Sequence, residues 1–341
     1  MPKKFNVGVI GAGRIGKIHI KNLVHNIPNV ELKSVSDIQI NEKLTQLVDS
    51  LGISILTDDP SEIFKDPEID AVIVASSTDT HARFIQTAAK DGKHIFCEKP
   101  IDTDIERIEN TIKIVEQNKV YLMIGFNRRF DPNFKRVYEA IESGEIGDPH
   151  IIKITSRDPN PPPIEYIKVS GGIFLDMTIH DWDMARYLAN SEVEEVYANG
   201  TVLVDPNIGK AGDIDTAIAV LKFKNGAMGV IDNSRQAVYG YDQRVEVFGS
   251  KGCAIADNQP SNTVKIYNND TIQKDKIPYF FLERYKESYR NELRYFFKCL
   301  ENQRNPKPNG TDGLKSILIA KAAQISLEKN HPIRINEIST S

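Results

Sequence analysis

A short glycine string near the start of the chain constrains its fold more than any other segment. Gly11, Gly13 and Gly16 follow an apolar run at residues 5–11 and open a segment at 14–26 whose apolar residues repeat at helical spacing. Between a strand and a helix, the first glycine permits a tight turn, the second lets a phosphate approach the backbone, and the third lets the helix pack against the strand. Free N–H groups at the start of the helix then face the phosphate. The string therefore predicts a dinucleotide site.

The residues after these glycines indicate which dinucleotide. Arg14 and Ile15 complete the loop, and Asp37 lies 21 residues beyond Gly16, at the end of the next expected strand. A carboxylate there accepts hydrogen bonds from the adenosine ribose and repels a 2′-phosphate, and Ile38 supplies no compensating cation. The sequence thus favours NAD over NADP. The alternative is that the glycines serve only a turn.

Strand and helix patterns alternate over the first 125 or so residues. The expected strands lie at 5–11, 30–37, near 55, 70–76, 94–99 and 121–127, and the expected helices at 14–26, 40–52, 60–65, 80–92 and 104–118. Strands regularly separated by helices indicate a parallel sheet covered on both faces. We therefore expect a doubly wound Rossmann domain at 1–125 that binds NAD.

The pattern changes near residue 150 to closely spaced strands. These are expected at 150–157, 194–204, 214–226, 226–234, 242–252 and 262–268, with helical segments around 171–190, 281–302 and 311–329. Short turns that contain Asn-Gly or Ser-Lys-Gly indicate antiparallel pairing. The chain is therefore expected to be α/β, with an α+β domain at 126–341 built on an open, mostly antiparallel sheet.

Composition excludes several other classes of protein. The 341 residues are 40% apolar and 26% charged with a net charge of −4, as in soluble globular proteins without a nucleic-acid or membrane partner. Cys97, Cys253 and Cys299 are far apart, and no zinc motif is present. The N-terminus lacks the pattern of a signal peptide, and no apolar run could span a bilayer. We expect a cytoplasmic protein that binds no metal.

The loop after the strand at 70–76 is a second candidate for cofactor binding. It contains Ser76, Ser77 and Thr78, with His81 close behind. Ligands of doubly wound sheets lie at the carboxyl ends of the strands, so this loop is expected to flank the dinucleotide. The alternative is a helix capped by Thr78 or Thr80, with His81 as a capping or core residue.

Glu98, Lys99 and Pro100 end the strand at 94–99. A lysine at this edge is expected over the cofactor and substrate rather than in bulk solvent. Pro100 fixes the chain direction, and a cis bond before it is one way to do so. The alternative is a surface lysine beside a turn.

A very apolar segment at 171–182 carries Asp176 and His180, four residues apart. On one helix they would share a face. A histidine suits proton transfer from an alcohol, and a neighbouring carboxylate orients it. Two alternatives remain, a metal site that includes Asp183 and a satisfied pair in the core.

Together these segments resemble the glucose–fructose oxidoreductase/inositol dehydrogenase (Gfo/Idh/MocA) family over nearly the whole chain. The resemblance is carried by VGVIGAGRIG, ASSTDTH, CEKP, IGFNRRFDP and GGIFLDMTIHDWDMARYL. The last stretch and the SRDPNPPPIEYIKVSGG before it are most similar to the inositol 2-dehydrogenase branch. The resemblance implies oxidation of myo-inositol to 2-keto-myo-inositol with NAD, within inositol catabolism. It also implies a dimer or homotetramer formed through the C-terminal sheet.

The resemblance also assigns roles to residues. It implies that Lys99, Asp176 and His180 are catalytic, with His180 as the proton acceptor. Arg129 matches a substrate-binding position, whereas Arg128 and Glu98 match cofactor positions. Asp158 and Tyr239 are candidates for contacts to substrate hydroxyls. Met177 departs from some relatives, which have a small hydroxyl residue there.

Two rival functions remain at this stage. One is the same reaction on another polyol or aldose, such as scyllo-inositol or chiro-inositol. The other is a non-catalytic regulator that senses NAD, since the family fold also serves in transcriptional control. Sensor relatives can dispense with the lysine and histidine, and this chain has both.

Overall fold

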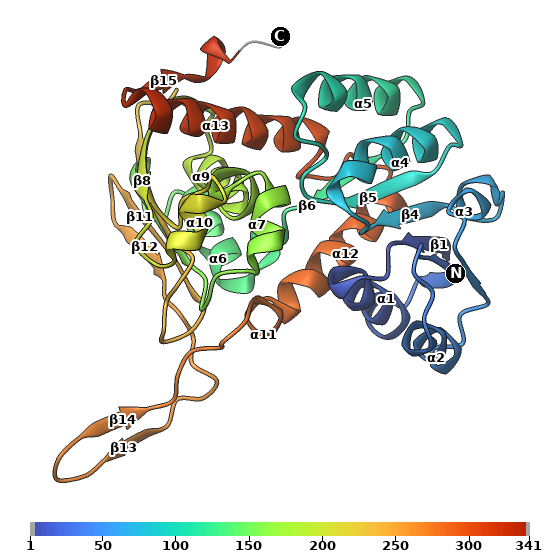
Figure 1. Cartoon of the computed structure of the whole chain (residues 1–341), viewed down its shortest axis with the longest axis horizontal. Helices are drawn as coiled ribbons and strands as arrows, with labels where there is room; N and C mark the ends of the chain where they lie inside the picture. The colour runs from blue at the N-terminus through green and yellow to red at the C-terminus, as the bar shows by residue number, and fades with distance from the viewer. Residues whose placement is uncertain (1–3, 339–341) are drawn as a thin grey trace. The chain divides into compact units, whose positions relative to one another are not determined.

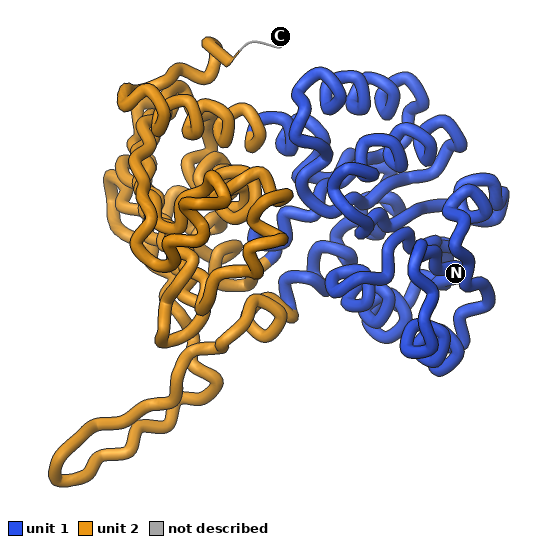
Figure 2. Tube along the Cα trace, viewed as in Figure 1, with its two compact units in different colours: residues 1–130, 287–315, 340–341 blue, residues 131–286, 316–339 orange. Residues whose placement is uncertain are grey.

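The computed structural model describes residues 4–338, which belong to two compact units (Figure 2). Of the described residues, the first unit contains 4–130 and 287–315, and the second contains 131–286 and 316–338. The sequence placed a single boundary at residue 125, whereas the chain returns to its first unit after residue 286. Within the described residues, no helix combines the length and the apolar character needed to cross a membrane.

The first unit is built on a six-stranded parallel sheet in the order β3-β2-β1-β4-β5-β6. Its strands are β1 (Phe5–Ile10), β2 (Val30–Ser36), β3 (Ile55–Thr57), β4 (Ala71–Val74), β5 (His94–Glu98) and β6 (Leu122–Gly125). Its helices are α1 (Arg14–Asn26), α2 (Glu42–Ser50), α3 (Ser61–Lys65), α4 (Thr78–Lys90), α5 (Ile105–Gln117), η1 (Asn127–Phe130) and α12 (Lys286–Glu301). In Figure 1, α1 and α2 lie on one side of the sheet, and α4 and α5 lie on the other. The expected doubly wound parallel sheet is confirmed.

Helix α12 belongs to the first unit because its apolar face completes that unit's core. Leu293, Phe296 and Phe297 are fully buried and lie in the same hydrophobic cluster as Phe5 and Phe96. The Phe5 and Phe297 ring centroids are 5.8 Å apart, and those of Phe96 and Phe296 are 5.9 Å apart. Burial of each such ring contributes roughly 1.5–3 kcal/mol. This periodic apolar face explains why the chain returns.

The second unit is built on a seven-stranded sheet in the order β12-β11-β7-β10-β9-β8-β15. Its strands are β7 (Pro149–Arg157), β8 (Val193–Thr201), β9 (Thr216–Phe223), β10 (Met228–Ser234), β11 (Asp242–Gly249), β12 (Cys253–Ala256) and β15 (Ile333–Arg334). Its helices are α6 (Pro132–Glu142), α7 (Ile164–Ser170), α8 (Ile173–Asp176), α9 (Ile179–Ala189), α10 (Pro206–Lys210), α11 (Phe281–Arg284), α13 (Gly310–Lys329, which begins in the first unit) and η2 (Ile335–Glu337). Among the described strands of this second sheet, only β7 and β10 pair in parallel. The expected, mostly antiparallel sheet is therefore confirmed.

Three expectations for the second half were wrong in detail. The strand expected at 262–268 does not join the main sheet, because β13 (Lys265–Tyr267) pairs with β14 (Ile272–Lys274) in a separate hairpin. Figure 1 shows this hairpin extending away from the sheet of its own unit. The helix expected at 171–190 is divided into α8 and α9, and that at 281–302 into α11 and α12.

Candidate functional site

The three glycines of the string lie in the loop between β1 and α1, and their surroundings differ. Gly11 has a φ of +92°, and a Cβ there would lie 2.5 Å from the Ser76 backbone nitrogen. A Cβ on Gly16 would lie 1.9 Å from the Gly11 carbonyl oxygen, whereas a Cβ on Gly13 would meet nothing within 4 Å. The first and third glycines are therefore required by close packing. The second leaves the space that a phosphate needs.

Asp37 lies immediately after β2 and is held beside this loop. Its carboxylate accepts hydrogen bonds from the Ala12 N–H at 2.6 Å and from the Gln39 N–H at 2.8 Å. The Ile38 side chain is 88% exposed and provides no cation. Gly13, the N-cap of α1, has no side chain to occupy the first N–H groups of the helix. The donor set therefore fits a pyrophosphate at the helix and ribose hydroxyls at Asp37.

The loop after β4 is tied to the loop after β5 by a buried histidine. His81 is 1% exposed, and its ring contacts the carbonyl oxygens of Pro100 at 2.7 Å and Ser76 at 3.1 Å. The Ser76 and Thr80 hydroxyls are 2.6 Å apart. The alternative, in which Thr78 or Thr80 caps α4, is not observed, because Ser77 is the N-cap and its side chain makes no capping bond.

Lys99 directly follows β5, at the sheet edge that also carries the loops after β1 and β4. Three parallel strands end there, so their following residues share one edge. The Lys99–Pro100 peptide bond is cis. Glu98, the last residue of β5, contacts the His19 ring, with 2.7 Å between Oε1 and Nε2.

Two arginines lie just after β6, in η1. Arg128 is 4% exposed and Arg129 is 9% exposed, so both are largely removed from solvent. The Nη2 group of Arg129 donates a hydrogen bond to the Asp312 carboxylate at 3.3 Å. Arg129 is therefore held by an acidic partner within its own unit.

In the second unit, Asp176 and His180 lie on either side of a break between two helices. Asp176 ends α8, Met177 and Thr178 form the junction, and His180 is the second residue of α9. The expectation of one helix was wrong because the Thr178 N–H bonds to the Ile173 carbonyl, five residues back. The spacing of four residues is thus measured across a junction rather than along one helical face.

The Asp176 carboxylate is held on both of its oxygens. The Tyr166 hydroxyl donates to Oδ1 at 2.7 Å, and an Nη1 of Arg235 donates to Oδ2 at 3.3 Å. Arg235 is 1% exposed and also donates to Asp213 at 3.1 Å, which in turn accepts the Ile173 N–H at the start of α8. Burial, with the negative charge of Asp176, raises the pKa of Tyr166 above its usual value. Asp176 is thereby fixed in place by a hydrogen bond to each of its carboxylate oxygens.

Sequence reasoning missed Tyr166, Arg235 and Asp213. Tyr166 lies in a stretch that carries the family resemblance, but no motif marks Arg235 or Asp213, and the three residues come from separate segments that meet only in the fold. The one available signal was that Asp176 lies in an apolar stretch and therefore needs partners.

A buried polar contact fixes the start of α9, where His180 lies. The Thr178 hydroxyl contacts Asn233 Oδ1 at 2.8 Å, and the Asn233 amide donates to Asp181 at 2.9 Å. Thr178 and Asp181 are both 0% exposed. The residues on either side of His180 are therefore anchored to β10.

Asp183, the third ligand in the metal alternative, lies 3.8 Å from the Arg186 guanidinium, which weakens that alternative.

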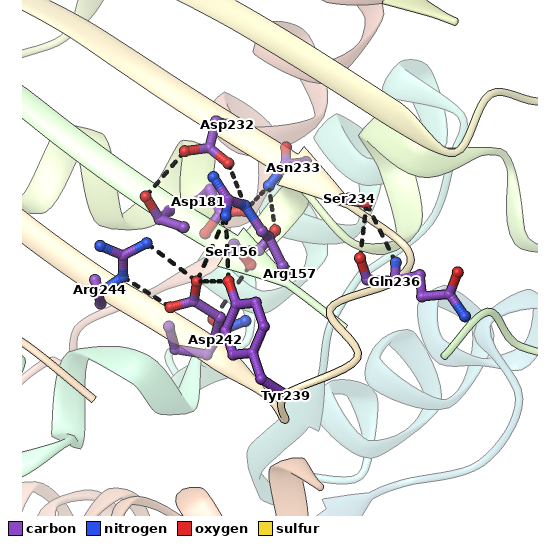
Figure 3. A network of polar contacts seen from close by, with 12 residues as sticks. Ser156, Arg157, Asp181, Asp232, Asn233, Ser234, Gln236, Tyr239, Asp242 and Arg244 are labelled. Carbon is purple, nitrogen blue, oxygen red and sulfur yellow. Dashed lines mark hydrogen bonds and ion pairs between the residues drawn. The ribbon is translucent and has the colours of Figure 1, made fainter. Parts of the chain in front are cut away.

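Figure 3 shows the polar network that contains Tyr239. The Tyr239 hydroxyl donates to Asp242 at 2.6 Å and accepts from Arg157 at 3.2 Å, and Arg157 also donates to Asp232 at 2.7 Å. Tyr239 is thus a member of a charged cluster at the ends of three strands. Asp158 follows β7, and its negative charge contributes to the raised pKa of Tyr166.

Replacing Arg235 with methionine is expected to lower the free energy of unfolding by about 3–5 kcal/mol, because Asp176 and Asp213 would keep buried charges without their cation. Arg136→Met is the matched control, since Arg136 pairs with Glu145 and both side chains are more than half exposed. That change should cost no more than about 1 kcal/mol. Denaturant unfolding of both variants measures the difference. Equal losses would show that Arg235 does not balance these carboxylates.

Comparison with known proteins identifies the family. Residues 5–126 match the model described as "Oxidoreductase family, NAD-binding Rossmann fold", and residues 134–255 match the GFO/IDH/MocA C-terminal domain. A Thermotoga maritima protein named myo-inositol 2-dehydrogenase is 51% identical over 97% of this chain and 99% of its own length.

Solved structures agree over the same length. A probable dehydrogenase from Thermotoga maritima has a TM-score of 0.96 at 50% identity, covering 98% of this chain and 100% of that one. Scyllo-inositol dehydrogenase from Lactobacillus casei, with bound NAD(H) and scyllo-inositol, has a TM-score of 0.90 at 30% identity, with 98% and 100% covered. The chain belongs to the GFO/IDH/MocA family of NAD-binding oxidoreductases.

Proposed function

We propose that this chain is an NAD-dependent dehydrogenase that oxidises one ring hydroxyl of an inositol, most specifically myo-inositol to 2-keto-myo-inositol. The observation that carries the proposal is similarity over nearly the full length of the chain to a protein named myo-inositol 2-dehydrogenase. The residues of the cofactor loop and of the α8–α9 junction suit that reaction.

The first unit has the groups needed to hold NAD. The open backbone at Gly13 and the first turn of α1, with Arg14 and Ile15, would take the pyrophosphate, and Asp37 would take the adenosine ribose. Bound NAD supplies the carbon that accepts a hydride from the substrate. Ser76, Ser77, Thr78, His81, Glu98 and Arg128 are proposed as further cofactor-binding residues.

His180 is proposed to accept the proton of the reacting hydroxyl, so that proton and hydride leave the same C–OH group and a ketone remains. Asp176 would orient the imidazole and stabilise its charged form. With both of its oxygens already held by Tyr166 and Arg235, its charge is supported without its taking the proton itself. Lys99 would stabilise the negative charge that develops on the substrate oxygen.

Arg129, Asp158 and Tyr239 are proposed to contact the remaining hydroxyls of the ring. A cyclic polyol presents donors and acceptors around its rim, and charged and phenolic groups match both. Tyr239 already takes part in hydrogen bonds as donor and acceptor, which shows that its hydroxyl can serve in either sense.

Initial rates with a panel of polyols and both cofactors test this function. We expect NADH formation with myo-inositol, and at least a tenfold lower kcat/KM with NADP, because Asp37 repels a 2′-phosphate and Ile38 offers no cation. Scyllo-inositol, chiro-inositol and glucose are the comparison substrates. If another polyol were oxidised and myo-inositol were not, the substrate assignment would be wrong, whereas inactivity with every compound would favour a sensor.

We also propose that two or more copies associate through the seven-stranded sheet. The outward residues of its two central antiparallel strands are apolar and between 37% and 55% exposed: Ile218, Val220, Met228 and Val230. Such a contiguous apolar face is typical of an interface, and a dimer or homotetramer would cover it. Sedimentation equilibrium measures the assembly. Among the described residues, Cys97, Cys253 and Cys299 are free thiols, which suit the cytoplasm as the proposed compartment. Inositol catabolism is the setting that the proposed reaction implies.

A further inference from the structure

Three titratable side chains meet inside the first unit, and one of them belongs to the residue before Lys99. They are His19 of α1, Glu98 of β5 and Glu292 of α12, and their nitrogen and carboxylate oxygen atoms lie within 4.8 Å of one another. His19 and Glu292 are 0% exposed. The Glu98 side chain is 13% exposed, and burial of the other two groups is costly and calls for an explanation.

Apolar groups surround this cluster. The His19 ring packs edge-on against Phe96 and Tyr289, with centroids 5.2 and 6.0 Å apart. Among the described residues, neither carboxylate oxygen of Glu292 has a hydrogen-bond partner. Among the described residues, the titratable groups that meet Glu292 are His19 from α1 and Glu98 from β5, and Tyr289 of its own helix packs against the His19 ring. Burial raises the pKa of Glu292 well above its ordinary value, and the negative charge of Glu98 raises it further.

A metal ion does not fit the observed contact between His19 and Glu98. Their Nε2 and Oε1 atoms are 2.7 Å apart, which is the length of a direct hydrogen bond. Two ligands of a tetrahedral zinc ion, each about 2.1 Å from the metal, would be separated by about 3.4 Å. The contact is therefore occupied by a proton, and a proton on Glu292 removes its unsupported charge.

Glu98 is confined on its other side by the neighbouring strand. A Cβ on Gly125, at the end of β6, would lie 3.0–3.2 Å from the carboxyl atoms of Glu98. The carboxylate is thus packed between Gly125 and the His19 ring. Since Glu98 is the residue before Lys99, whatever holds Glu98 also fixes the backbone from which Lys99 extends.

We propose that Glu292 is a positioning residue: its buried carboxyl group is a neutral acid that packs beside the His19–Glu98 pair, and this pair holds the end of β5 in the place that Lys99 requires. The effect on catalysis rests on the role proposed for Lys99, whereas the protonation of Glu292 is independent of that role.

Protonation is tested by the pH dependence of unfolding in wild type and Glu292→Gln. Below about pH 4.5 the folded and unfolded chains both hold this proton, and its stabilising contribution is complete. Above that pH the unfolded chain loses the proton while the folded chain keeps it, so the contribution is lost as the pH rises toward the folded pKa. The ratio of the wild-type unfolding constant to that of Glu292→Gln should therefore rise tenfold per pH unit over this range.

Glu287→Gln is the matched control for this measurement, because Glu287 lies on the same helix with its side chain 53% exposed. Its unfolding constant should run parallel to that of wild type across the range. If the unfolding constant of Glu292→Gln also ran parallel to that of wild type, the proposal that Glu292 is a neutral acid in the folded chain would be wrong. The proposal would also be wrong if the purified wild type contained one equivalent of a divalent metal that Glu292→Gln lacked.

Positioning is tested by comparing Glu292→Gln with Glu292→Met in the inositol assay. The amide is neutral, polar and close in shape to the protonated carboxyl group, so Glu292→Gln should retain kcat within about twofold. Methionine differs in shape and places no polar group beside the His19–Glu98 pair, so kcat should fall at least tenfold with both KM values near wild type, as expected when only transition-state stabilisation is lost. An unchanged kcat in a folded Glu292→Met protein would refute positioning. An inactive wild type would instead refute the proposed function, and the unfolding measurement would still decide the protonation.

Discussion

Replacing Lys99 with methionine is expected to lower kcat by a hundredfold or more while NAD affinity stays within a few-fold of wild type. The ammonium group is proposed to act on an oxygen whose negative charge grows only as the hydroxyl is oxidised. An interaction that strengthens in the transition state affects kcat, and loss of one such donor typically costs a factor of about 10²–10³. The glycine loop and Asp37, which would hold the cofactor, are left intact.

Steady-state rates and a titration of NAD binding by fluorescence measure the two quantities. Lys113→Met is the matched control, since Lys113 is exposed on α5 of the same unit and should be replaceable without effect. If kcat of Lys99→Met stayed near wild type, the role proposed for Lys99 would be wrong. If NAD affinity fell in parallel with kcat, Lys99 would instead be a cofactor-binding residue.

His180→Gln is expected to reduce kcat by a factor of about 10²–10⁴ at neutral pH, which is the usual contribution of a positioned general base. The amide cannot accept the hydroxyl proton, so that proton must pass to hydroxide from solvent. The residual rate should therefore increase about tenfold for each pH unit, whereas the wild-type rate should level off once its base is deprotonated.

Rates from pH 6 to 10 distinguish this role from a structural one, because misfolding would not produce the added dependence on hydroxide. His150→Gln is the control, since His150 lies at an exposed position of β7 in the same unit. A variant with the wild-type pH profile, merely scaled down, would indicate that His180 orients the substrate rather than taking its proton.

Much of the fold could be predicted because its signals are local. The helix expected at 14–26 coincides with α1, and the alternation of strands and helices led directly to the parallel sheet. The Asn-Gly turn at 225–226 likewise joins β9 to β10, which pair antiparallel. In each case neighbouring residues in the sequence carry the pattern.

Features that depend on distant contacts were the ones missed. The break at Thr178 requires Asn233, more than fifty residues later, and the support of Asp176 requires Arg235. The apolar face of α12 could be recognised as helical, but nothing in its own sequence says that it packs against Phe5 and Phe96 rather than within the second unit. Sequence periodicity reports that a face is buried without naming its partner.

The return of α12 to the first unit also sets an order of events during synthesis. When a ribosome has made residues 1–130, the strands of the parallel sheet are complete, but Phe5 and Phe96 still lack the helix that covers them. More than 150 further residues must emerge before Leu293, Phe296 and Phe297 can close that core. The nascent first unit therefore carries an open apolar surface while the second is being made, and that interval is when a chaperone would protect it.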